Sequence, residues 1–241
     1  MQPIVKTFSI KGNERKTNSD YVEIKSLLKD WIGVVCDGVG EANGLENSGK
    51  LCAQKILELI EKSSEPDPLK KMKWAIETTN QYLYKIQENS LDNYQSATTL
   101  VVLYLSNYTA CWGHVGDSRI YKLKNGRLNL LTKDHSVIQE LVDGGFLTLR
   151  EAAFHIGTNI IGRAMGEKPN VIVDVSKINL QPFDKNRFFL CTDGVTSILS
   201  DAEIENCLQK DTVKECSENF ILLMNSKNIT DDSSFIVVDP T

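Results

Sequence analysis

Residues 96–132, SATTLVVLYLSNYTACWGHVGDSRIYKLKNGRLNLLT, decide the fold class of this 241-residue chain. The stretch contains four runs rich in β-branched and aromatic residues with no helical pattern between them, which predicts four consecutive strands. Between the last two runs, Asn125-Gly126 is a strong signal for a two-residue hairpin turn. Consecutive strands joined by short turns pair in antiparallel fashion, so the stretch argues against a doubly wound parallel sheet.

The segments on either side of this stretch predict further strands and helices, with no internal repeat or interdomain linker between them. Residues 1–241 are therefore expected to form a single domain. Between 137 and 166, short helical pieces broken by glycines indicate a flap insertion. Apolar residues at helical spacing are expected to face the core at Ile56, Leu59, Ile60, Trp74, Tyr82 and Ile86. The predicted strands cover about 20–27, 30–37, 171–178, 187–192 and 234–239, and the predicted helices about 46–62, 68–89, 201–209 and 212–225.

The composition argues against several classes of partner. The 32 acidic and 27 basic residues give a net charge of −5 and form no basic stripe, so no nucleic-acid partner is expected. No apolar stretch approaches the ~20 residues of a membrane span, and the N-terminal residues lack the apolar core of a secretory signal. We therefore expect a cytoplasmic protein without a membrane partner. The six cysteines show no C-x-x-C spacing and are expected to be reduced thiols.

Aspartates stand at the ends of apolar runs at five places along the chain. Taken singly, each has an ordinary structural explanation, because Asp-Gly is a common turn pair and aspartate often caps the backbone. Their recurrence, with no Lys or Arg beside most of them, favours a cleft in which the carboxylates share multivalent cations. Oxygen ligands without His or Cys at ligand spacing suit Mg²⁺ or Mn²⁺ and argue against zinc. Two such ions can activate a bridging water for an in-line displacement, so phosphate ester hydrolysis is the indicated reaction class. The aspartates are Asp20, Asp37, Asp117, Asp193 and the pair Asp231-Asp232.

Eight short motifs add a family resemblance to this chemistry. In their order along the chain they resemble the metal-dependent serine/threonine protein phosphatases of type 2C, the PPM family, in their short bacterial form. Together they cover nearly the whole chain. The motifs are RKTNSD (15–20), DGVG (37–40), SATTLVV (96–102), GDSRIYKL (116–123), LTKDHS (131–136), NIIGRAMG (159–166), LCTDGV (190–195) and DDSSFIVV (231–238).

The resemblance implies an α+β fold in which two packed antiparallel β-sheets are flanked by helices, an α-β-β-α sandwich with a flap insertion. It implies hydrolysis of phosphoserine and phosphothreonine in proteins by a water that bridges two Mn²⁺ or Mg²⁺ ions, without a phosphoenzyme. A weaker third ion is part of the same pattern. The implied partners are a phosphoprotein substrate and, as the activity to be opposed, a bacterial Ser/Thr kinase, with the enzyme acting as a monomer.

The resemblance also assigns roles to individual residues. Asp37 would bridge the two ions, and the Gly38 carbonyl would bind one of them. Asp193 and Asp231 would complete the other ion. The register at 231–234 is chosen over Asn228-Ile229-Thr230 because its spacing to the last strand fits the family pattern, and within it Asp231 is preferred over Asp232. Asp20 would support the site, largely through water.

Two further roles follow from the same pattern. Asp117 matches the position of the weaker third metal. Arg15 would hold the phosphate, a task that suits its planar guanidinium. The flap at 137–166 would cover the cleft and influence substrate choice.

The chain departs from the family pattern at a few positions. Ser19 stands where many relatives carry an acidic residue, so weaker outer-sphere support for one metal is expected. Val39 replaces a histidine proposed as general acid in animal members, and Glu41 replaces a usual glycine. The histidines at 114, 135 and 155 are interpreted as structural, and the thiols of Cys36 and Cys191 as packed, because no arginine loop follows either cysteine.

Two other functions stay open from the sequence. A catalytically weak module on the same fold would bind a phosphoprotein or another partner through the cleft, and the changes at Ser19 and Glu41 keep this alternative open. The retained aspartates and Arg15 oppose it, since a pure binding module would not need them all. A metal-dependent nuclease is opposed by the acidic charge of the chain.

Overall fold

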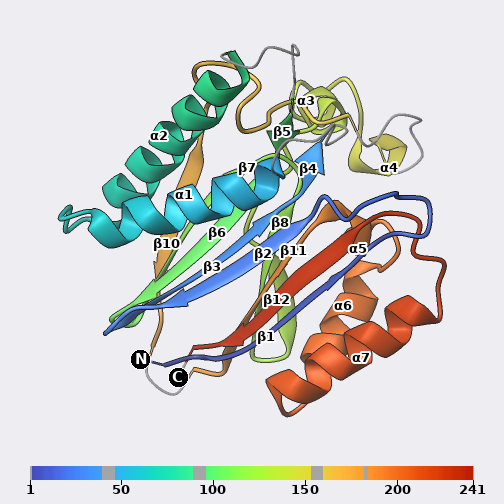
Figure 1. Ribbon diagram of the computed structural model, residues 1–241. Helices are drawn as coiled ribbons and strands as arrows, with labels where there is room; N and C mark the ends of the chain where they lie inside the picture. The colour runs from blue at the N-terminus through green and yellow to red at the C-terminus, as the bar shows by residue number, and fades with distance from the viewer. Residues whose placement is uncertain (1, 40–46, 89–95, 153–159, 182–183, 241) are drawn as a thin grey trace.

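A computed structural model of the chain describes residues 2–39, 47–88, 96–152, 160–181 and 184–240. Two five-stranded antiparallel sheets pack face to face, and a short strand pair lies beside them (Figure 1). One sheet has the order β1 (Ile4–Ile10), β12 (Ser233–Asp239), β11 (Asn186–Cys191), β8 (Arg119–Lys124), β9 (Arg127–Leu130). The other has the order β10 (Asp174–Asn179), β7 (Thr109–Val115), β6 (Leu100–Ser106), β3 (Asp30–Cys36), β2 (Tyr21–Ser26), and the short pair is β4 (Gly38–Val39) with β5 (Ala97–Thr98).

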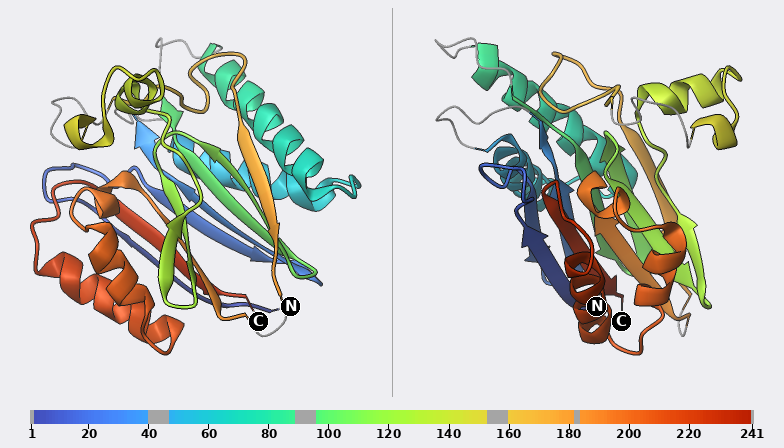
Figure 2. Two further views of the ribbon diagram at one scale, coloured as in Figure 1. Left: turned by 180° about the vertical axis from the view of Figure 1, so that it is seen from behind. Right: turned by 90° about the vertical axis from the view of Figure 1, so that its right-hand side faces the viewer.

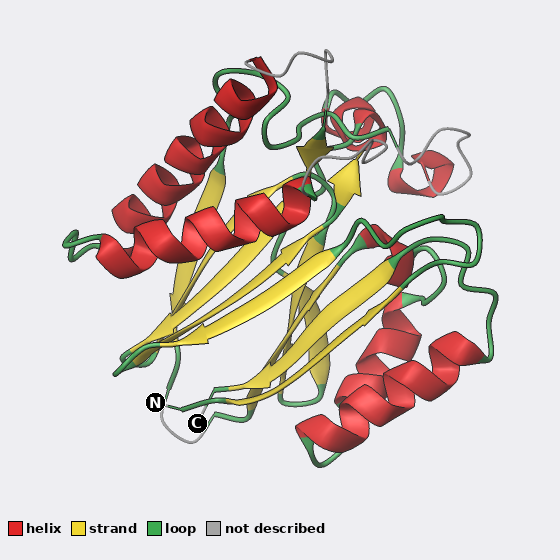
Figure 3. Ribbon diagram, in the orientation of Figure 1, coloured by secondary structure: helices red, strands yellow, loops and turns green. Residues whose placement is uncertain are grey.

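Helices cover the outer face of each sheet, as the secondary-structure colouring of Figure 3 and the turned views of Figure 2 show. α1 (Ser48–Lys62) and α2 (Pro68–Glu88) pack on the β2–β3 sheet, and α6 (Asp201–Leu208) and α7 (Val213–Asn225) pack on the β11–β12 sheet. Within the described residues, none of the helices is long and apolar enough to cross a membrane. The shorter helices are α3 (Val137–Asp143), α4 (Leu149–Ala152) and α5 (Asp193–Thr196).

The strands β3, β6, β7, β11 and β12 bury both of their faces, which explains why their sequences are nearly continuous apolar runs. In β12, Phe235 and Val237 join the core under α6 and α7, whereas Ile236 and Val238 join the core between the sheets. This alternation is the period of two that any strand has. The predicted arrangement of two packed antiparallel sheets between helical layers is confirmed.

The predicted hairpin turn at Asn125-Gly126 is also confirmed. Both residues have positive φ, 52° and 75°, as a two-residue turn between twisted strands requires. A second turn of the same kind joins β6 to β7 through Asn107 and Tyr108, with φ of 42° and 60°. Its sequence gives a weaker signal, because a bulky residue rarely adopts positive φ.

Two predictions about the elements were wrong or incomplete. Trp74 and Tyr82 do not face the core, since 45% and 37% of their surfaces are exposed. The buried face of α2 carries Met72, Ile76 and Leu83 instead, and the ring of Tyr82 lies on the surface with Lys55 Nζ 5.1 Å from its centroid. The strand β1 was not predicted, because it is a half-exposed edge strand whose partner, β12, lies at the other end of the sequence.

Candidate metal centre

The strand register brings five of the predicted aspartates to one end of the sandwich. Tyr21 pairs with Cys36, so Asp20 and Asp37 lie at the same end of the β2–β3 ladder. In the other sheet, Cys191 pairs with both Arg119 and Phe235, so the start of β8, the end of β11 and the start of β12 lie at one end of the sheet (Figure 1). Asp117 precedes β8, Asp193 follows β11 at the start of α5, and Asp231 precedes β12. Hydrogen bonds from Thr192 to Asp20 and from Ser19 to Asp232 join these ends, so the two sheets meet around a set of carboxylates.

Electrostatics show that these carboxylates act on one another. Burial raises the pKa of Asp37 well above its ordinary value, and the charges of Asp20, Asp193 and Asp117 raise it further. Burial likewise raises the pKa of Asp20 and of Asp117 to about 7, and the charge of Asp193 contributes to both. Desolvated like charges are costly when no cation is near, so the cluster favours binding of cations.

The donor set fits a hard divalent metal. Asp20 Oδ1, Asp117 Oδ1 and Asp193 Oδ1 are buried, and among the described residues they have no hydrogen-bond partner. Buried polar atoms are normally paired, so three orphaned carboxylate oxygens at one place point to a ligand. Oxygen-only ligands of this kind suit Mg²⁺ and Mn²⁺.

Threonine side chains hold the backbone of Asp37 in place. The Asp37 N–H donates to Thr99 Oγ1 over 3.0 Å, and its carbonyl accepts from the Thr99 N–H over 2.8 Å and from Thr98 Oγ1 over 2.9 Å. Thr99 Oγ1 also lies 2.6 Å from Ser118 Oγ, next to Asp117. Thr99 thus links the chain at Asp37 to the chain at Asp117.

A similar contact holds Asp20. Thr192 Oγ1 donates to Asp20 Oδ2 over 2.9 Å and accepts from the Ser234 N–H over 3.0 Å. This threonine directly precedes Asp193, so one hydroxyl connects β2, β11 and β12 at the cluster. The other oxygen of Asp20 keeps its lone pairs free for a ligand.

Gly38 is placed by close backbone contact. Its N–H donates to the Ser19 carbonyl over 3.2 Å, and a Cβ on Gly38 would lie only 2.8 Å from that oxygen. A larger residue would therefore push the two segments apart. The Ser19 carbonyl also accepts from Asn47 Nδ2 over 3.0 Å, and Asn47 caps helix α1.

Arg15 and Asp231 pair with each other. Arg15 Nε and Nη2 donate to the two oxygens of Asp231, each over 2.6 Å, and this bond raises the pKa of Arg15. The neighbouring Asp232 is buried, and both of its oxygens accept hydrogen bonds from the segment that precedes Asp20. Asp231 is the more exposed of the two and is the one that faces Arg15.

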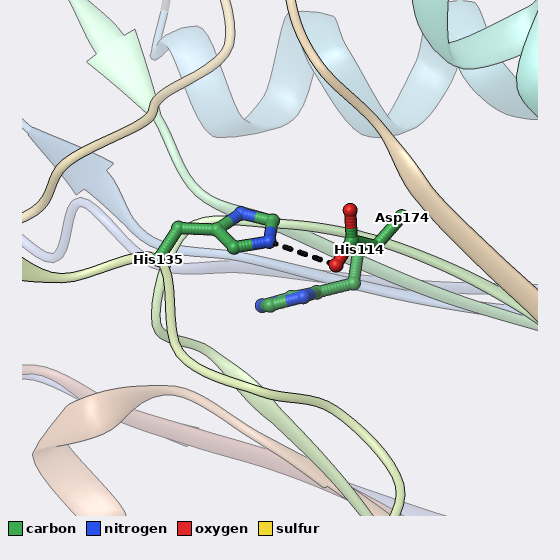
Figure 4. A group of neighbouring side chains, drawn as sticks. All are labelled: His114, His135 and Asp174. Carbon is green, nitrogen blue, oxygen red and sulfur yellow. Dashed lines mark ion pairs between the residues drawn. The ribbon is translucent and has the colours of Figure 1, made fainter. Parts of the chain in front are cut away.

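The structure brings together a second polar group, which the sequence did not indicate. His114, His135 and Asp174 each have a ligand atom within 4.8 Å of the others, and Figure 4 shows the two rings beside the carboxylate. Among the described residues, no three aspartates of the acidic cluster have carboxylate oxygens within 4.8 Å of one another. A close group of three suits one ion, whereas a cleft for two ions separates its ligands further.

The histidine group is nevertheless a poor metal site. The Gly116 N–H donates to His135 Nδ1 over 3.1 Å, so the proton of the neutral ring is on Nε2, which lies 3.3 Å from Asp174 Oδ2. Neither nitrogen of His135 then offers a lone pair to a metal. The His114 ring packs against His135 with centroids 4.3 Å apart, and burial lowers its pKa to about 3. We interpret the pair as structural support for Gly116, whose φ is +108° and which precedes Asp117.

Sequence reasoning missed the residues that orient the aspartates. Thr99 and Thr192 lie within motifs that were recognised, but no role was assigned to them. Hydroxyl residues at the ends of buried apolar runs are the signal that could have found them. The expectations for Glu41 and for the histidine at 155 lie outside the described residues.

Comparison with known proteins agrees with this geometry. The family described as Protein phosphatase 2C matches residues 13–227. The serine/threonine phosphatase stp of Listeria innocua is 28% identical over 235 residues, covering 95% of this chain and 92% of the relative. Serine/threonine phosphatase Stp1 from Staphylococcus aureus has a similar structure, with a TM-score of 0.88 and 25% identity over 100% of this chain and 96% of that one. The catalytic domain of PstP in complex with 2 manganese ions gives a TM-score of 0.84 with 26% identity, over 98% of this chain and 97% of that one.

The chain therefore belongs to the protein phosphatase 2C family. It is a metal-dependent serine/threonine protein phosphatase that uses divalent cations, as the resemblance of its motifs indicated. The fold resemblance is confirmed over nearly the whole chain.

Proposed function

We propose that the chain hydrolyses phosphoserine and phosphothreonine in proteins with two Mn²⁺ or Mg²⁺ ions held in the acidic cluster. Asp37 and the Gly38 carbonyl would hold one ion, and Asp37, Asp193 and Asp231 the other. Asp20 would support the centre through water, and Asp117 would hold a weaker third ion. When bound, the ions activate a water and stabilise charge on the phosphoryl group.

The observation that carries this proposal is the set of orphaned carboxylate oxygens on Asp20, Asp117 and Asp193. Carboxylates kept in place by threonine hydroxyls are already oriented when the ions arrive, so little of the binding energy is lost to reorganisation. Arg15 lies beside the cluster with half of its side chain exposed. Its guanidinium group can hold two phosphate oxygens once Asp231 binds a metal ion instead of Arg15.

The proposed substrate and setting follow from the relatives of the chain. The relatives are bacterial serine/threonine phosphatases, which supports a phosphoprotein substrate and an action opposed to a Ser/Thr kinase. All of the proposed ligands belong to one chain, which is compatible with a monomer. Size-exclusion chromatography with light scattering measures the oligomeric state directly, and a dimer whose disruption abolishes activity would contradict this part.

The first test is turnover of an aryl phosphate and of a phosphothreonine peptide with Mn²⁺, with Mg²⁺ and with EDTA. Wild type is expected to need the metal, and Asp193→Ala is expected to lose activity because one ion loses a ligand. Asp211→Asn, which changes an exposed carboxylate, is the matched control and is expected to behave as wild type. Metal binding without turnover in wild type would favour the catalytically weak binding module instead.

A further inference from the structure

Asp232 is a buried carboxylate for which the proposed function has no role. Only 2% of its surface is exposed. Oδ1 accepts from the Gly12 N–H over 2.9 Å, and Oδ2 accepts from the Ser19 N–H over 2.7 Å and from Ser19 Oγ over 2.8 Å. Within the described residues, Lys and Arg side chains form no ion pair with it, because Arg15 bonds to Asp231. Neutral donors alone hold this anion beside the acidic cluster.

These bonds join the start of β12 to the segment that carries Arg15. Gly12 begins a turn in which its carbonyl accepts from the Arg15 N–H over 3.2 Å. A Cβ on Gly12 would overlap the backbone at Asp231, so the two segments are in direct contact. Asp232 therefore fixes both ends of the segment between Gly12 and Ser19.

Ser19 connects Asp232 to two candidate metal ligands, Gly38 and Asp20. Its N–H and hydroxyl bond to Asp232, while its carbonyl accepts from the Gly38 N–H. The Gly38 peptide is thus oriented by a residue that Asp232 orients. Asp20 follows Ser19 directly and is held on its other side by Thr192.

We propose that Asp232 is a positioning residue of the metal centre, fixing the segment with Arg15 and Asp20 and supplying the outer-sphere negative charge that Ser19 lacks. The inference rests on the proposed function. It revises the expectation that the serine at 19 weakens support for the metal, because the acidic group reaches the same place from the C-terminal strand. The charge of Asp232 also contributes to the raised pKa values of Arg15 and Asp20, which agrees with this proximity.

The test compares Asp232→Asn with wild type by calorimetric titration of Mn²⁺ and by the dependence of turnover on Mn²⁺ concentration. The substitution removes the negative charge of Asp232. It also replaces one acceptor oxygen with an amide NH₂ group, which faces one of the three donors from Gly12 and Ser19. We expect Mn²⁺ affinity to fall by about 10–100-fold, the usual effect of losing an outer-shell partner. Turnover should recover at saturating Mn²⁺. The melting temperature in EDTA should change little, because removing the charge of Asp232 from beside Asp20 offsets the lost hydrogen bond. A merely structural role would lower the melting temperature without changing Mn²⁺ affinity.

The double variant Ser19→Glu/Asp232→Asn tests the charge argument. The introduced glutamate returns a negative charge at position 19 and can accept from the introduced amide, so Mn²⁺ affinity is expected to recover at least in part. Asp211→Asn removes one charge elsewhere and should leave the affinity unchanged.

Several outcomes would overturn the inference. Unchanged Mn²⁺ affinity in Asp232→Asn would do so, as would a double variant no better than the single one. If Asp232→Asn does not fold, Ser19→Ala decides, because it removes only the hydroxyl bond to Asp232. Its Mn²⁺ affinity should be measurably weaker than that of wild type, and an unchanged affinity would overturn the inference. A wild type that binds no Mn²⁺ would instead refute the proposed function, on which this role depends.

Discussion

Replacing Asp37 with asparagine is expected to lower turnover of a phosphothreonine peptide by more than about 100-fold, beyond the range seen for outer-shell partners of a metal. The same change is expected to raise the melting temperature of the metal-free protein. Both effects come from one cause, because Asp37 is buried and the charges of Asp20, Asp193 and Asp117 all act on it. A charge placed to share cations is costly when they are removed.

The stability of the metal-free protein should depend on pH, and the raised pKa values determine the direction of that change. Burial raises the pKa of Asp20 and of Asp117 to about 7, whereas a free aspartate titrates near ~3.9. The folded chain therefore binds these protons more tightly than the unfolded chain does. Stability in EDTA should be greatest at low pH as far as these groups are concerned, and should fall as pH rises from about 4 to about 7. Asp37→Asn removes one of the interacting charges, so its loss of stability over that window should be smaller.

Melting curves in EDTA at a series of pH values, with and without added Mn²⁺, measure these effects. Asp211→Asn is the control for removal of an exposed carboxylate. Wild type should gain stability on addition of Mn²⁺, because a ligand that binds only the folded state stabilises it. An Asp37→Asn variant that is less stable than wild type in EDTA at pH 8 would show that this carboxylate is not under electrostatic strain.

The sequence predicted most of the strands because their apolar runs are long and bounded by clear turn signals. Phe235 to Val238 form an apolar run that predicts a strand whichever sheet the strand joins, so the local sequence pattern is sufficient for that prediction. The edge strand β1 is different, since its partner lies more than two hundred residues away and four of its seven residues are exposed. Trp74 was misplaced because spacing gives the period of a helix but not which stripe meets the sheet.

The residues of the candidate site also divide into those that the sequence indicates and those that only the structure shows. Asp37 and Asp193 are visible in the sequence because a charge that ends an apolar run is unusual. Thr99 and Thr192 are not, because a threonine in a β-rich run is ordinary until its hydroxyl is seen to bond to the aspartate. The contact between Ser19 and Asp232 joins residues 213 positions apart, and no local pattern predicts it.

Replacing Arg187 with methionine is expected to destabilise the protein by about 3–5 kcal/mol, the usual cost of removing one partner of a largely buried ion pair. The side chains of Arg187 and Asp239 are 10% and 26% exposed. Arg187 Nε and Nη2 bond to both oxygens of Asp239, over 2.6 and 2.7 Å. Nη1 donates to the carbonyls of Leu208 and Lys210, each over 2.6 Å, at the end of α6. The variant leaves a carboxylate and two carbonyls without their donor. Thermal melting should show a drop of about 6–20 °C, at 2–4 °C per kcal/mol for a domain of this size.

Activity per folded molecule should be unchanged, because six residues of extended chain, about 20 Å, separate Arg187 from Asp193. Lys214→Met is the matched control, since its pair with Glu218 is exposed and worth less than about 1 kcal/mol. The double variant Arg187→Met/Asp239→Leu separates the causes. Partial recovery of stability would mean that the unpaired carboxylate carries most of the cost, because the second change removes that charge. If Arg187→Met melts within 2 °C of wild type, this buried network contributes little and the expectation is wrong.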